Sequence, residues 1–166
     1  NGSDTVSLGI ALTTTGTNVG IKTNNNDTEA QSNTVTVTKT GSITTGTGNN
    51  AYGIFNDGAY NTTTVSGSIT TAGFFANGIR NDGNYNKTTL SGSITTSNDT
   101  YAYGIYNLGD SNTTTVSGSI TTGTGNSAHG IINIGSNNTT TVSGSIATTG
   151  SRAVGINNQG SNNTTT

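Results

Sequence analysis

The sequence predicts an all-β fold, a parallel β-helix (β-solenoid) with 25-26-residue turns. One observation is a repeat: the motif Asn-Thr-Thr-Thr-Val-Ser-Gly-Ser-Ile begins at Asn61 and returns with small changes, and its closing Ile falls at 43, 69, 94, 120 and 146. Self-similarity at this period is typical of solenoids, in which each turn packs only on its neighbours. The other observation is the dominance of β-branched Thr, Val and Ile, which favours strands over helices.

The composition excludes several classes of protein. Of 166 residues, 106 are Thr, Gly, Asn or Ser, only 27% are hydrophobic, and Pro, Cys, Met and Trp are absent. A globule around one wide core, a disulfide framework and a thiolate metal site are therefore excluded. A net charge of −2 argues against a nucleic-acid partner, and without 18 consecutive apolar residues we expect no membrane-spanning helix. Because the chain starts at Asn1 without a leader-like stretch, we expect a processed product or a piece of a longer protein.

The repeated motif predicts which side chains face the interior. Val65 and Ile69 have the same parity, so alternation directs Thr62 and Thr64 outward, as well as Ser66 and Ser68. We expect Gly67 to mark a corner or a bulge. The equivalents of Val65 should stack in one inward ladder, formed by Val65, Leu90, Val116 and Val142.

A second signature, Ala-x-Gly-Ile-x-Asn-x-Gly, begins at Ala51 and recurs in step with the first. Ala51 should point inward and Tyr52 outward, and Ile54 and Asn56 should point inward after a break at Gly53. Each turn then holds two short strand pairs and three glycine-rich bends. Because stacked turns lie ~4.8 Å apart, the repeated asparagines should form an amide ladder at a bend, made of Asn56, Asn81, Asn107, Asn133 and Asn158.

The first coil is less regular than the others. We expect residues 1-32 to form an irregular coil with a polar loop over Asn24–Ser32, and residues 33-166 to form the regular solenoid repeats. Lys39 stands where later turns have Val or Leu. Four residues of the first coil fit the repeat pattern: Val6, Ile10, Gly20 and Ile21.

Three outward columns vary between repeats, and a varying column is free of packing constraints from the interior. One begins at Tyr52, the next at Phe55 and the third at Asp57. They predict a candidate binding surface for sugar rings or a partner, formed by Tyr52, Phe55, Arg80, Tyr103 and Tyr106. The alternative is that these rings only add cross-strand stacking to a weak sheet. Phe74 and Phe75 should cover the coil edge at a bend.

No residue pattern predicts catalysis, a cofactor or a metal site. His129 is the sole histidine, and no Asp is placed to orient it. Asp57 and Asp82 stack in one column, but the column continues as Leu108 and Ile134, and the calcium-binding nonapeptide of other β-rolls is absent. We therefore expect a protein that is not an enzyme. Asn-x-Thr sequons at Asn61 and its equivalents would place any glycans in one row.

The signatures Thr-Val-Ser-Gly-Ser-Ile and Ala-x-Gly-Ile-x-Asn-x-Gly resemble the degenerate repeats in passenger regions of bacterial autotransporters, which are secreted β-helical surface proteins and often adhesins. The resemblance covers residues 33-166 well and residues 1-32 loosely. It implies export to the cell surface or the extracellular space, and the absence of Cys suits passage through a narrow pore as an unfolded chain. The sequence fits a piece of a longer passenger or a free subunit that shares the repeat.

Three functions follow as expectations. The first is a non-catalytic structural or adhesive role at the cell surface, with glycans or proteins of a host or neighbouring cell as partners. The second is a self-assembling extracellular fibre subunit that stacks on itself end to end, because uncapped coils leave open strand edges. The third is an ice-binding solenoid with outward Thr ladders such as Thr62 and Thr64, although Lys87 interrupts one ladder.

Overall fold

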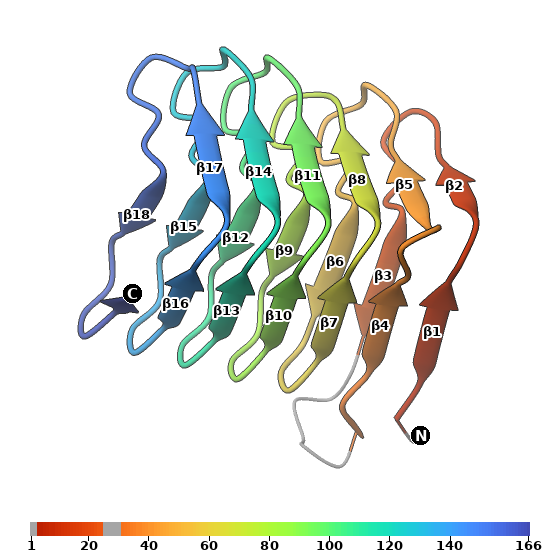
Figure 1. The fold of residues 1–166 in the computed structure, drawn as a ribbon, viewed down its shortest axis with the longest axis horizontal. Coiled ribbons are helices and arrows are strands. Elements are labelled where there is room, and N and C mark those ends of the chain that lie inside the picture. The colour runs from red at the N-terminus through yellow and green to blue at the C-terminus, as the bar shows by residue number, and fades with distance from the viewer. Residues whose placement is uncertain (1–2, 25–30) are drawn as a thin grey trace.

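The computed structural model describes residues 3–24 and 31–166, which form a parallel β-solenoid of about six turns of roughly 26 residues with almost no helix. The coils follow one another along the long axis, so the two ends of the chain lie at opposite ends of the molecule (Figure 1). Within the described ranges, no helix has the length and apolar character needed to cross a membrane. The predicted fold class is confirmed.

Each regular turn contributes one strand to each of three parallel sheets, rather than the predicted two strand pairs. Sheet A consists of β1 (Thr5–Leu8), β4 (Thr34–Val37), β7 (Thr62–Val65), β10 (Lys87–Leu90), β13 (Thr113–Val116), β16 (Thr139–Val142) and β19 (Thr164–Thr165). Sheet B consists of β2 (Ala11–Thr13), β5 (Ser42–Thr44), β8 (Ser68–Thr71), β11 (Ser93–Thr96), β14 (Ser119–Thr122) and β17 (Ser145–Thr148). Sheet C consists of β3 (Ile21–Asn24), β6 (Ile54–Asp57), β9 (Ile79–Asn81), β12 (Ile105–Asn107), β15 (Ile131–Asn133) and β18 (Ile156–Asn158).

The inward ladder of sheet A has the predicted register. Leu90 pairs with Val65 on one side and Val116 on the other, and Val116 pairs with Val142. The first three side chains are fully buried, and Val142 is partly buried against the core. Ile69 and its equivalents complete a narrow interior, so little apolar area per coil is enough to form a core. The predicted parity of this strand is confirmed.

Gly67 makes the corner between sheets A and B, as the sequence predicts. A Cβ atom at this position would overlap the carbonyl oxygens of Thr38 and Gly41 in the preceding coil. Only glycine allows the backbones of consecutive coils to approach this closely.

The predicted amide ladder runs through the interior. Asn56 Nδ2 donates to Asn81 Oδ1 at 2.6 Å, and the next three steps to Asn107, Asn133 and Asn158 are each 2.7 Å. Asn56 Nδ2 also donates to Thr63 Oγ1 at 3.0 Å, which links sheet C to sheet A. These asparagines lie near the C-terminal ends of the sheet C strands rather than within a bend. Because each amide is paired, the interior holds a buried polar row without leaving those groups unsatisfied.

A second asparagine ladder was not predicted. The side-chain Oδ1 of Asn86 accepts the backbone N–H of Asn61 at 2.8 Å, and the equivalent steps to Asn112 and Asn138 are each 2.7 Å. These four side chains are no more than 1% exposed. These amides hold the coils together, so in the folded chain the sequons of this row are buried rather than presented to solvent.

The first coil differs from the predicted alignment. Leu8 and Leu12 face the core, since they pair with Val37 and Ile43, whereas Ile10 is 72% exposed. Val6, Gly20 and Ile21 align with the inward positions of later coils as predicted.

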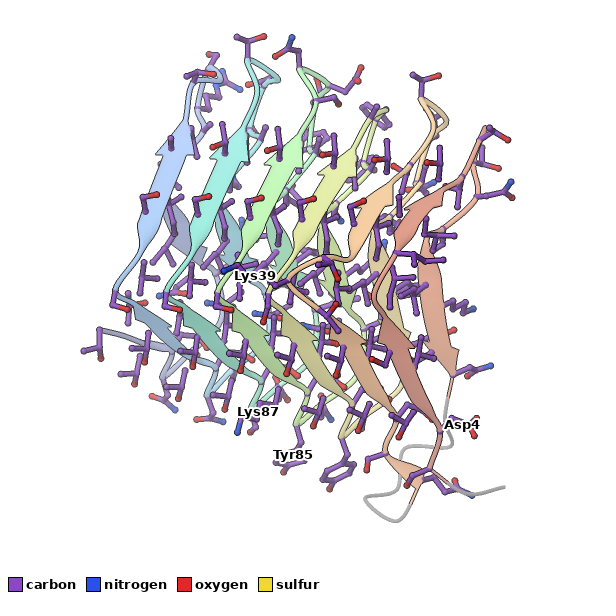
Figure 2. The ribbon with its side chains drawn as sticks, turned by 45° about the vertical axis from the view of Figure 1, so that its right-hand side comes forward. Asp4, Lys39, Tyr85 and Lys87 are labelled. Atoms are coloured by element: carbon purple, nitrogen blue, oxygen red, sulfur yellow. The ribbon has the colours of Figure 1, made fainter. Side chains whose placement is uncertain are left out.

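The remaining expectations for the first two coils concern a corner and a loop. Lys39 does not occupy a core position: it lies exposed in a turn after Val37, where the corner between β4 and β5 is longer than in later coils (Figure 2). Of the predicted loop over Asn24–Ser32, Asn24 ends β3, and residues 25–30 lie outside the described residues.

Candidate binding face

The aromatic side chains are confined to one side of the solenoid. We define the aromatic face as the outer surface of sheet C together with the two corners that flank it. It contains all six Tyr and three Phe of the chain, namely Tyr52, Phe55, Tyr60, Phe74, Phe75, Tyr85, Tyr101, Tyr103 and Tyr106. The strands of sheets A and B direct almost only threonine and serine outward. One of the three faces is therefore chemically unlike the other two.

Arg80 occupies the centre of this face. The register of sheet C places it between Phe55 and Tyr106, as the sequence predicts. Its guanidinium carbon lies 5.4 Å from the ring centroid of Phe55, 5.2 Å from that of Tyr106 and 5.1 Å from that of Tyr52. Arg80 Nη1 also donates to Tyr52 Oη at 2.6 Å. The cation thus joins three rings from the two coils on either side of its own.

Asp82 fixes the orientation of Arg80. Its two oxygens accept hydrogen bonds from Arg80 Nε at 2.6 Å and Nη2 at 2.7 Å, a bidentate pair on the same coil. Burial disfavours the charge on Arg80, but the hydrogen bonds and charge of Asp82 outweigh it and raise the pKa of the guanidinium. A second pair joins Lys22 Nζ to Asp57 Oδ2 at 2.9 Å, with Lys22 Nζ 5.0 Å from the ring centroid of Phe55. Asp57 and Asp82 therefore each have a cation beside them.

The predicted exposure of two tyrosines is wrong. Tyr103 is only 7% exposed and Tyr52 only 6%. Stacked coils lie ~4.8 Å apart, so rings in one column cover one another: the Tyr103 ring stacks on the His129 ring at 5.6 Å and also contacts the ring of Tyr106 at 5.5 Å. Burial raises the pKa of Tyr103 to about 12. Phe55, Arg80 and Tyr106 are half-buried and supply the accessible part of the predicted set.

Two stacked aromatic pairs at the corners were missed by the sequence reasoning. Tyr60 stacks on Tyr85 with ring centroids 5.0 Å apart, at the corner after sheet C. Phe75 stacks on Tyr101 at 4.9 Å, at the corner before sheet C, where the bend predicted for the two phenylalanines is confirmed. All four residues have positive φ, between 55° and 59°. The available signal was their spacing, since Tyr60 and Tyr85 occupy the same place in consecutive repeats.

The arrangement offers stacking surfaces and hydrogen-bonding groups. Among the described residues, no three His, Cys, Asp or Glu side chains are grouped to hold a metal ion. His129 Nδ1 accepts the backbone N–H of Val154 at 3.1 Å, and its Nε2 lies 3.0 Å from Asn157 Nδ2. Both nitrogens of this histidine are thus engaged within the solenoid.

The fold defines the chain as a β-helix repeat protein, a parallel β-solenoid. No protein-family model, curated protein or solved structure matches the sequence or the fold.

Proposed function

We propose that this solenoid is a non-catalytic adhesive protein of the cell surface or extracellular space, and that its aromatic face binds glycans on a host or neighbouring cell. One observation carries the proposal: every aromatic residue lies on one of three faces or at its corners. Aromatic rings pack against the apolar faces of sugars, and the hydrogen-bonding groups between them engage hydroxyls. Such a one-sided surface is typical of a binding face rather than of a scaffold.

Stability alone gives a weaker account of these rings. Sheets A and B connect the same coils through main-chain pairing and small hydroxyl side chains. Because two sheets are held together in this way, the third does not need rings for its pairing. Arg80 supports the same interpretation, since Asp82 holds its guanidinium in place between the half-buried rings of Phe55 and Tyr106.

Two substitutions on the aromatic face test the proposal. Asn157 occupies the same column as Phe55 and Tyr106, so the sheet accommodates asparagine there. We expect the double variant Phe55→Asn/Tyr106→Asn to lose at least about tenfold in binding to immobilised surface glycans, with the melting temperature little changed. Adhesion to cells and binding to a glycan array would be measured beside thermal unfolding.

The matched control lies on sheet B. Thr121 pairs with Ala147 in the next coil, so Thr121→Ala makes a change that the column already contains. We expect this variant to bind and adhere like the unmodified chain. Equal losses of stability and adhesion in the aromatic double variant would instead favour a purely structural role for the rings. Unchanged adhesion, together with long filaments of the unmodified chain in electron micrographs, would favour the fibre subunit.

A further inference from the structure

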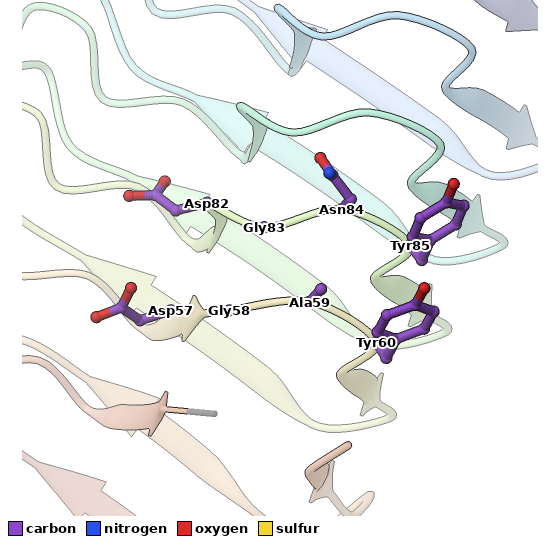
Figure 3. A pocket seen from close by; sticks show the side chains of 8 residues that line it. All are labelled: Asp57, Gly58, Ala59, Tyr60, Asp82, Gly83, Asn84 and Tyr85. Carbon is purple, nitrogen blue, oxygen red and sulfur yellow. The ribbon is translucent and has the colours of Figure 1, made fainter. Parts of the chain in front are cut away.

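A hollow of about 360 Å³ opens where the chain leaves sheet C for sheet A. Two consecutive coils line it with equivalent segments, residues 57–60 and 82–85. Figure 3 shows the carboxylates of Asp57 and Asp82 at one end and the rings of Tyr60 and Tyr85 at the other. The hollow is therefore a cleft across two coils, with acceptors at one end and an aromatic wall at the other.

The tyrosines of this cleft are not explained by backbone preference. Tyr60 and Tyr85 have φ of 59° and 57°, a left-handed conformation that is unfavourable for a residue with a Cβ atom. The next two residues of the column are Ser111 and Asn137, which have the same conformation. Small polar residues can therefore form this corner, so the backbone conformation does not require the two tyrosines.

One of the two rings is open to a ligand. Tyr60 and Tyr85 stack with an interplanar angle of 12°, and Tyr85 is 54% exposed. Ser111 follows Tyr85 in the column and has no ring to cover it (Figure 2 shows Tyr85 projecting from the corner). A flat apolar surface of this kind fits the face of a pyranose ring that carries C–H groups.

The polar groups of the cleft favour a neutral ligand. Asp57 is paired with Lys22 at 2.9 Å, and Asp82 is paired with Arg80 at 2.6 Å, so neither acid is left to attract a free cation. A carboxylate has about four acceptor sites, so each acid keeps capacity to accept from hydroxyl groups.

Asn84 adds a donor to the same cleft. Its Oδ1 accepts the backbone N–H of Asp110 at 2.7 Å, which holds the side chain in place. The Asn84 side chain is exposed, and its amide N–H groups are therefore available to a sugar oxygen.

We propose that this cleft binds a neutral oligosaccharide of the glycan, with one pyranose unit stacked on Tyr85 beside Asn84, whose amide donates to a sugar oxygen, and with hydroxyls of a further unit donating to Asp57 and Asp82 at the other end. This inference rests on the proposed function, because it names the class of sugar that the aromatic face would recognise. It adds a subsite that the sequence reasoning did not identify.

Isothermal titration calorimetry of the whole chain tests the subsite. The probes are neutral trisaccharides of glucose, galactose or mannose, a sialylated trisaccharide, and calcium chloride alone. We expect at least one neutral trisaccharide to bind, the sialylated one to bind at least tenfold more weakly, and calcium alone to give no heat. Tyr85→Ser should weaken the neutral trisaccharide at least tenfold at an unchanged melting temperature, because Ser111 adopts the same backbone conformation.

The double variant Phe55→Asn/Tyr106→Asn separates this inference from the proposed function. If it loses glycan binding while Tyr85→Ser binds normally, the subsite is wrong and the aromatic face stands. If Tyr85→Ser alone loses binding, the subsite stands and the centre of the face is not the contact. If no saccharide binds, both the subsite and the proposed glycan-binding function are wrong. If calcium chloride gives heat and no saccharide does, the cleft is a cation site rather than a sugar subsite.

Discussion

Single residues act in this protein through their columns, because equivalent side chains in successive coils make the same bond. Asn77 Oδ1 accepts the backbone N–H of Tyr103 at 2.9 Å, and His129 Nδ1 accepts that of Val154 at 3.1 Å two coils further on. Both are contacts from one coil to the next. Burial lowers the pKa of His129, so the neutral ring that can accept this bond is favoured.

The lowered pKa of His129 predicts that the stability of the protein depends on pH. In the unfolded chain His129 has a pKa of ~6.5, and in the folded chain its pKa is lower. As pH falls through ~6.5, the unfolded chain takes up the proton first, so the free energy of unfolding decreases and levels off below the folded pKa. Protonation of Nδ1 would also break the bond from Val154. Urea unfolding at neutral and mildly acidic pH measures this loss.

Asn77 supplies the matched control for the pH effect. His129→Asn keeps an acceptor for the Val154 N–H, as Asn77 does for Tyr103, and it has no proton to gain. We expect the stability of this variant to be flat over the range in which the unmodified chain loses stability. The same pH dependence in both proteins would rule out His129 as its source.

At the scale of the elements, alternation in the repeats was enough to place the strands of sheets A and B. Val65 and Ile69 are buried and Thr62 and Thr64 face outward because the period of a strand is two. The first coil was misaligned because Ile10 is apolar, has the expected spacing from Val6, and nevertheless points outward. Only the pairing with the next coil shows that Leu8 and Leu12 face the core and that Ile10 does not.

The candidate site was predicted in part. The order of columns placed Arg80 between Phe55 and Tyr106, because register follows directly from the repeat. The burial of Tyr103 was not predictable from parity, since parity gives the direction of a side chain but not what covers it. The corner tyrosines were missed because left-handed conformations are usually assigned to Gly or Asn.

Close approach between coils makes a prediction for the glycine column that opens sheet C. A Cβ atom at Gly130 would lie 2.6 Å from the carbonyl oxygen of Gly155 and would overlap Ile146 Cγ2. At Gly155 itself, a Cβ atom meets only Ile146 Cγ2, at 3.8 Å. We expect Gly130→Ala to lower the free energy of unfolding by about 2 kcal/mol or more, and Gly155→Ala to change it little. Urea unfolding of both variants measures the difference, and equal losses would mean that a general glycine effect, not the clash, is responsible.

At the scale of the whole molecule, stability comes from many equivalent contacts along one axis. Each coil buries its interior only against its neighbours, and the asparagine ladders run along the solenoid in the same direction. A disturbance in an interior coil therefore removes contacts on both of its sides. Whether a side chain points into the core, more than its position along the strand, should therefore decide whether its substitution is tolerated.

Two substitutions in strand β13 test this argument. Val116 is fully buried between Leu90 and Val142, so Val116→Asp places a carboxylate without a partner in the apolar ladder and should lower the free energy of unfolding by more than about 3 kcal/mol. Thr113 begins the same strand, is exposed and pairs with Lys87 in the preceding coil, so Thr113→Asp should be neutral or slightly stabilising. Circular dichroism would follow urea unfolding, and limited proteolysis would locate the first coil to open. Undiminished stability of Val116→Asp, or an equal loss in Thr113→Asp, would contradict the assigned direction of the whole sheet A ladder.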